Sequence, residues 1–107
     1  MQDLQIKVER STGPPVVRLA GELDMDTAPA VRQTLEELSE SDGRFKLDLA
    51  AVTFIDSSGL HLLLDAANRL NGSGPLTLMS VPPRVSRLME IVGLSDVPSL
   101  NVQKQED

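Results

Sequence analysis

Apolar and polar residues alternate in two short stretches near the start of the chain, at residues 4–8 and 16–20. A period of two is typical of strands with one face on the core and one on solvent. Between the two stretches stands Gly13-Pro14-Pro15, which is a strong turn signal. The pattern therefore predicts an N-terminal hairpin of two strands.

A helical pattern follows an acidic loop at residues 21–26. Asp26 or Thr27 is a suitable N-cap, and Pro29 fits the first turn. Apolar residues then recur three or four positions apart until residues 39–43 end the run, and they are Ala28, Val31, Leu35 and Leu38. This spacing predicts an amphipathic helix at the surface.

The period changes twice more in the middle of the chain. Residues 45–49 alternate like a strand, and apolar character continues as far as Ile55. From Ser57 the spacing becomes helical until Asn71-Gly72, with one apolar face formed by Leu60, Leu63, Leu64, Ala67 and Leu70. A strand followed directly by a long amphipathic helix is predicted here.

The last third repeats the same order of elements. Residues 75–79 predict a short strand, and Pro82-Pro83 leads into a third helix. Its shared apolar face consists of Val85, Leu88, Met89 and Val92. Gly93 would end that helix and Leu94 would pack back on its last turn. A final strand is expected at residues 97–102, before a polar tail at 103–107.

The order of the elements predicts an α/β fold with a mixed β-sheet. An N-terminal hairpin is followed by strands and helices in alternation, which implies parallel strands joined by right-handed crossovers. With 107 residues and no linker or repeat, we expect one domain over residues 1–107, ordered at about 4–102.

Composition narrows the function. The net charge is −6, the ten lysines and arginines are scattered, and the only aromatic residues are Phe45 and Phe54, so a nucleic-acid partner is not expected. There is no cysteine for disulfides or thiolate chemistry. No stretch approaches the ~20 apolar residues of a membrane span, and the N-terminus has no signal-peptide core. A cytoplasmic protein without membrane contact is expected.

The most informative segment is residues 54–60, Phe-Ile-Asp-Ser-Ser-Gly-Leu. It brings a carboxylate and two hydroxyls to the start of a helix, where free N–H groups and the helix dipole favour an anion. A phosphate on Ser57 would be tolerated there, and Gly59 would let another backbone or a bulky partner group approach closely. The plain alternative is an ordinary helix cap, for which Asp and Ser are common.

Three segments in register resemble STAS domains, and among them the anti-sigma factor antagonists. Residues 54–60 resemble the phosphorylation motif of that family, and residues 19–24 with Thr27 resemble its second strand and following loop. Residues 84–94 are similar to its third helix. The resemblance covers residues 4 to about 102, and the double proline Pro82-Pro83 departs from the commonest pattern.

The resemblance implies a role for each residue of these motifs. Ser57 would accept the phosphate, Ser58 would cap the helix or support the backbone, and Asp56 would hydrogen-bond the nearby backbone. The implied partner-binding face consists of Glu22, Leu23, Asp24, Thr27, Asp56, Ser57, Ser58, Gly59 and Leu60.

The resemblance also implies a mechanism of partner switching. The unphosphorylated protein would bind an anti-sigma factor, a serine kinase with a histidine-kinase-like ATPase fold, and so release the sigma factor. Phosphorylation at Ser57 adds about −1.5 to −2 charges and would end this binding, and a serine phosphatase would reverse it. The protein would then be a monomeric regulator without a cofactor, and no enzyme.

Two residue patterns suggest other chemistries, a hydrolytic site and a calcium loop. Ser57, His61 and Asp65 are spaced i, i+4, i+8 like a hydrolytic set, but the G-x-S-x-G elbow is absent. Glu22, Asp24 and Asp26 mimic the start of a calcium loop that lacks its glycine. STAS domains also occur as transporter tails, as subunits of lipid-transport ATPases and as stress-sensing scaffolds, and a lipid-transport subunit would need no phosphorylated serine. The intact Asp-Ser-Ser-Gly motif at residues 56–59 favours a protein that is switched by phosphorylation.

Overall fold

A five-stranded mixed sheet organises the computed structural model, which describes residues 4–70 and 74–105. The strands lie side by side in chain order: β1 (Gln5–Glu9), β2 (Val16–Leu23), β3 (Lys46–Ile55), β4 (Leu76–Val81) and β5 (Leu100–Lys104). β1 and β2 are antiparallel, and the other neighbours are parallel. The predicted α/β fold with an N-terminal hairpin is confirmed.

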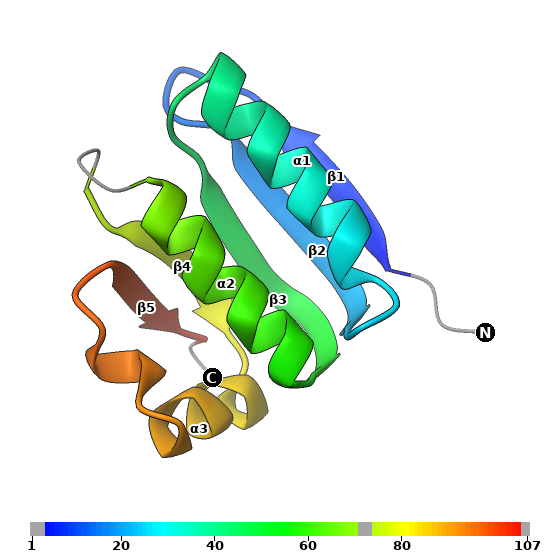
Figure 1. Cartoon of the computed structure of the whole chain (residues 1–107), viewed down its shortest axis with the longest axis vertical. Helices are drawn as coiled ribbons and strands as arrows, with labels where there is room; N and C mark the ends of the chain where they lie inside the picture. The colour runs from blue at the N-terminus through cyan, green and yellow to red at the C-terminus, as the bar shows by residue number, and fades with distance from the viewer. Residues whose placement is uncertain (1–3, 71–73, 106–107) are drawn as a thin grey trace.

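Two of the helices cover one face of this sheet. Figure 1 shows α1 (Ala28–Ser41) and α2 (Ser57–Arg69) lying over the strands, while α3 (Pro83–Ile91) lies beside the start of α2. The strands supply fully buried aliphatic side chains to the space between the layers, among them Val17, Leu19, Leu47, Leu49, Leu76 and Leu78. The core is therefore almost entirely aliphatic, as the scarcity of aromatic residues requires.

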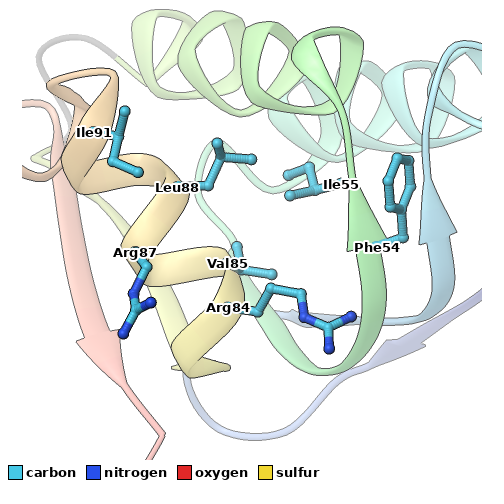
Figure 2. A pocket seen from close by; sticks show the side chains of 7 residues that line it. All are labelled: Phe54, Ile55, Arg84, Val85, Arg87, Leu88 and Ile91. Carbon is cyan, nitrogen blue, oxygen red and sulfur yellow. The ribbon is translucent and has the colours of Figure 1, made fainter.

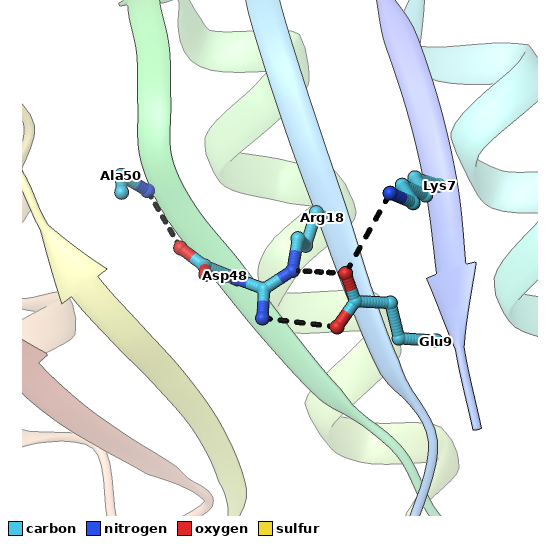
Figure 3. A network of polar contacts seen from close by, with 5 residues as sticks. All are labelled: Lys7, Glu9, Arg18, Asp48 and Ala50. Atoms are coloured by element: carbon cyan, nitrogen blue, oxygen red, sulfur yellow. Dashed lines mark hydrogen bonds and ion pairs between the residues drawn. The ribbon is translucent and has the colours of Figure 1, made fainter. Parts of the chain in front are cut away.

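The opposite face of the sheet is polar. The register pairs Lys7 with Arg18 and Arg18 with Asp48, so these three side chains point to the same face. Arg18 binds the Asp48 carboxylate and donates to both Glu9 oxygens at 2.8 and 3.0 Å, as Figure 3 shows. The hydrogen bonds from Arg18 lower the pKa of Glu9, and Glu9 raises the pKa of Arg18. This network ties the first three strands together across their outer face.

Several strand ends differ from the prediction because the paired strand determines them. β2 continues through Gly21 and Glu22 to Leu23, where an acidic loop was expected, since Leu23 pairs with Ile55 at the end of β3 and is fully buried. β3 itself runs on from the predicted residues 45–49 as far as Ile55. The expected loop at residues 21–26 is thus only Asp24 to Thr27.

The last two strands are also shifted. β4 occupies Leu76–Val81 rather than residues 75–79. A short 3₁₀ helix, η1 (Leu94–Asp96), precedes β5, which begins at Leu100 instead of 97 because Leu100 is the partner of Leu76. Pro98 has no N–H for a sheet ladder, which agrees with this later start. β5 includes Gln103 and Lys104, so the predicted tail begins too early.

The apolar faces of α1 and α3 were predicted with different success. All four predicted residues of α1 are buried. In α3, Val85 and Met89 are buried and Leu88 is half-buried, but Val92 follows the helix and is 52% exposed. Gly93 ends the helix as expected, with a φ of +82° that favours glycine. The two prolines fit the helix entry: Pro82 is extended, and Pro83 is the first helical residue.

The buried face of α2 is wider than its sequence pattern suggested. Leu60, Leu63, Ala67 and Leu70 are buried as predicted, whereas Leu64 is only half-buried. Leu62, which was not assigned to the core, is 1% exposed. The helix ends at Arg69 with Leu70 as its C-cap, and the predicted end at Asn71-Gly72 lies outside the described residues.

The start of α2 lies in direct contact with the end of β2. A Cβ atom at Gly59 would lie 2.6 Å from Ile55 Cγ1 and 2.7 Å from the Leu23 carbonyl oxygen. Glycine is therefore required because the chain's own backbone approaches there. Of the two groups that the sequence allowed next to Gly59, another backbone or a bulky partner group, it is the backbone of the same chain that lies there.

The first prediction concerns the face of α2. Leu62→Ala is expected to lower the free energy of unfolding by about 2–5 kcal/mol, because it leaves a cavity in the core. Leu64→Ala is expected to cost only about 1 kcal/mol, since this side chain is half-buried. Urea titrations of both variants measure the difference; an equal or greater loss at Leu64 would contradict this orientation of α2.

The second prediction concerns the contact at Gly59. Gly59→Ala is expected to destabilise by about 1–3 kcal/mol, since the added methyl group meets a backbone oxygen that cannot rotate away. Gly13→Ala is the matched control, because a Cβ there has no atom within 4 Å. Thermal and urea unfolding of both should separate them, and a Gly59→Ala variant as stable as Gly13→Ala would refute the contact.

Candidate functional site

An exposed serine begins α2. Ser57 is the first residue of the helix, and among the described residues no hydrogen bond engages its hydroxyl. It follows the end of β3, on the side of the sheet where the carboxyl ends of the parallel strands lie. The hydroxyl is thus presented to solvent on a helix end that is held by its neighbours.

Asp56 caps the start of α2. Its backbone is extended, and its Oδ1 accepts hydrogen bonds from the N–H groups of Ser58 at 2.8 Å and Gly59 at 3.1 Å. Its own N–H donates to the Leu23 carbonyl at 3.2 Å. The expected bonding of Asp56 to nearby backbone is confirmed. Of the two roles implied for Ser58, that of helix cap is wrong, because Asp56 is the cap.

A second acidic residue organises the neighbouring loop. Asp24 Oδ1 accepts from the N–H groups of Asp26 at 3.0 Å and Thr27 at 3.1 Å. Thr27 Oγ1 accepts from Asp24 N at 2.9 Å and donates to the Glu22 carbonyl at 2.8 Å. Thr27 is the N-cap of α1 by position, but its side chain makes no cap hydrogen bond with the helix. The loop is therefore tied from within.

The structure brings together all the residues of the expected partner-binding face but exposes only some of them. The two segments meet through the bond between Asp56 N and Leu23 O. Leu23, Asp24, Gly59 and Leu60 are buried, and Ser57 is exposed; the half-buried members are Glu22, Thr27, Asp56 and Ser58. The buried members can act only by positioning the others.

Met25, which was not among the predicted partner-binding residues, is 71% exposed in the same loop.

An apolar groove close to Ser57 was also missed. It has a volume of about 290 Å³ and lies between the end of β3 and α3 (Figure 2). Its lining residues are Phe54, Ile55, Arg84, Val85, Arg87, Leu88 and Ile91. One sequence signal was available, because Ile91 is a large apolar residue outside the apolar face predicted for the third helix. It is 74% exposed.

The other chemistries that were considered have no geometry to support them. Asp65 is paired with Arg32 at 2.9 Å, His61 is exposed, and no hydrogen bond joins Ser57, His61 and Asp65 in the described part of the chain. Residues 4–70 and 74–105 contain no group of three His, Asp or Glu side chains that could hold a metal ion. Within the same ranges, every helix is too short or too polar to cross a bilayer.

Comparisons with known proteins point to one family. The family model described as "Mlab, STAS domain" matches residues 6–102. The anti-sigma-B factor antagonist of Listeria monocytogenes is 38% identical over 88% of this chain and 83% of its own length. The anti-sigma F factor antagonist of Paenibacillus polymyxa is 36% identical over 86% and 81%. The crystal structure of an anti-sigma factor antagonist from Mycobacterium paratuberculosis superposes with a TM-score of 0.81 at 30% identity, covering 92% of this chain and 85% of that chain.

The third prediction tests the cap beside Ser57. Asp56→Ala is expected to lower the free energy of unfolding by about 0.5–2 kcal/mol, because two N–H groups lose their acceptor. Asp56→Asn should retain most of the stability, since its side-chain oxygen can accept the same bonds. Asp26→Ala is the control, an exposed carboxylate in the neighbouring loop. Urea midpoints are the readout, and equal stability of the two alanine variants would count against the cap.

Proposed function

Because this chain belongs to the STAS domain family, we propose that it is an anti-sigma factor antagonist that is switched off by phosphorylation of Ser57. The observation that carries the proposal is the exposed Ser57, whose hydroxyl makes no hydrogen bond within the described residues, at the start of a helix that Asp56 already caps. Such a group can be modified without disturbing the core.

In the unphosphorylated state, the protein binds an anti-sigma factor through the surface around Ser57. We take this partner to be a serine kinase with a histidine-kinase-like ATPase fold, whose binding releases the sigma factor. The exposed and half-buried residues near Ser57 supply the contact: Glu22, Met25, Asp26, Thr27, Asp56, Ser57 and Ser58. Leu23 and Gly59 hold this surface in shape from beneath.

The switching step is a phosphoryl transfer from ATP. The Ser57 oxygen forms a bond to the γ-phosphorus, and the bond from that phosphorus to the β,γ-bridging oxygen breaks. ADP leaves, and the hydroxyl proton passes to a base of the kinase. A serine phosphatase reverses the change by hydrolysis. This chain is the substrate in both steps and supplies no catalytic group.

The charge of the phosphate explains why binding ends. It adds about −1.5 to −2 charges to a surface that already carries the Asp26 and Asp56 carboxylates. Two N–H groups of the first turn, which were expected to be free and to favour an anion, are already bonded to Asp56. The new charge therefore stays directed at the partner, where repulsion and desolvation oppose binding without any refolding.

The fourth prediction combines pull-downs from a lysate of the native organism, with magnesium ADP present so that no phosphoryl group is transferred during capture, with a separate phosphorylation assay in magnesium ATP. Wild type and Ser57→Ala are expected to capture an anti-sigma kinase, and Ser57→Asp is expected to lose it. Ser11→Asp is the control, because it adds the same charge at an exposed serine of the hairpin turn. Phosphate incorporation is expected in wild type and in Ser58→Ala, and not in Ser57→Ala.

Two results would contradict the proposal. Undiminished phosphate incorporation in Ser57→Ala would remove Ser57 as the acceptor. Capture of one and the same transporter ATPase or scaffold by wild type and Ser57→Asp would replace the anti-sigma role with the alternative of a lipid-transport subunit or a stress-sensing scaffold.

A further inference from the structure

The groove between β3 and α3 exposes apolar surface that the core does not require. Ile55 and Val85 form its floor, with 6% and 2% of their surface exposed. Phe54 on one wall is 45% exposed, and Ile91 on the other is 74% exposed. Figure 2 shows Ile91 and Leu88 of α3 on one side of the groove and Ile55 and Phe54 of β3 on the other, with Leu88 and Ile55 lying between Ile91 and Phe54. A gathering of large apolar side chains at the surface is typical of a protein-binding site.

Two arginines give this groove a charge opposite to that of the whole protein. Arg84 and Arg87 line it from α3. In Figure 2 the Arg84 side chain reaches toward β3, whereas the Arg87 side chain extends toward β5. Among the described residues, neither has a carboxylate oxygen within 4 Å. Glu90 on the same helix pairs with Lys104, and Arg87 attracts it only at longer range. Two cations that form no ion pair in the described part of the chain, beside an apolar floor and on a chain of net charge −6, complement a ligand that is both apolar and acidic.

The groove is continuous with the surface around Ser57. Phe54 and Ile55 are the last residues of β3, and two residues after Ile55 the same segment presents Ser57. Figure 1 shows the start of α3 next to the start of α2. A partner seated over Ser57 therefore reaches the groove without a change in the fold.

We propose that this groove is a second docking site for the anti-sigma factor, occupied by an amphipathic segment of that protein with apolar and acidic side chains. The inference rests on the proposed function and adds to it where the partner is held. Apolar side chains of the segment enter between Phe54 and Ile91, and its carboxylates face Arg84 and Arg87. Amphipathic helices in apolar grooves recur in protein recognition.

The fifth prediction uses the anti-sigma factor captured by wild type, purified and titrated by calorimetry. Ile91→Ser is expected to weaken binding about tenfold or more, while Val92→Ser should change the Kd by less than about threefold. Val92 is a matched control because it is exposed next to Ile91 but does not line the groove.

The charge is tested in the same way. Arg87→Glu is expected to weaken binding about tenfold or more. In the double variant Arg84→Gln, Arg87→Gln, the Kd should depend less on salt concentration than it does in wild type. Arg44→Glu is the control for net charge, because Arg44 is exposed and precedes the opposite end of β3. Urea midpoints equal to wild type exclude a general loss of folding as the cause of weaker binding, and substitutions at exposed positions leave stability nearly unchanged.

The outcomes separate this inference from the proposed function. If Ile91→Ser and Arg87→Glu bind like wild type while Ser57→Asp does not bind, the groove is not a docking site and the switch stands. Equal weakening by Ile91→Ser and Val92→Ser would also overturn the groove. If wild type binds no anti-sigma factor, the proposed function fails, and the groove proposal fails with it.

Discussion

The close seating of α2 on the end of β2 is the contact on which the site depends. The Leu23 carbonyl accepts the Asp56 N–H at 3.2 Å and lies 2.7 Å from the place where a Cβ of residue 59 would be. Backbone therefore lies against backbone, and the buried side chains of Ile55 and Leu23 close around the same point. This contact sets the position of Ser57 relative to the loop after β2, so that residues more than thirty positions apart share one surface.

Two carboxylates of the site fix the backbone on either side of this contact. Asp56 holds the first turn of α2, and Asp24 holds the loop before α1, each by accepting two backbone N–H groups. An acidic run in the sequence can suggest metal binding or acid–base chemistry, but here the backbone engages both carboxylates: Asp56 is the N-cap of α2, and Asp24 closes the loop before α1. Ser57 differs because its hydroxyl is exposed and carries none of the structure's hydrogen bonds in the described region.

The sequence predicted the kinds of elements well and their ends less well, for a physical reason. Periodicity reports which face of a segment is buried, and it identified all four core residues of α1. The end of a strand depends on its partner, which is distant in sequence. Leu23 is a strand residue because Ile55 lies beside it. The same limit applies to the groove: the sequence placed Ile91 outside the apolar face of the third helix, but the groove beside it follows from where α3 packs against the end of β3.

The groove and the switch make opposite demands on charge, and one partner can meet both. A segment rich in carboxylates would be attracted to Arg84 and Arg87, which have no ion-pair partner among the described residues. The same carboxylates would be repelled when a phosphate appears on Ser57 nearby. Under the proposed function, acidic character that strengthens the unphosphorylated complex would also make it more sensitive to phosphorylation. Because the backbone beneath both sites is fixed at Leu23 and Gly59, the change is electrostatic and needs no conformational signal between them.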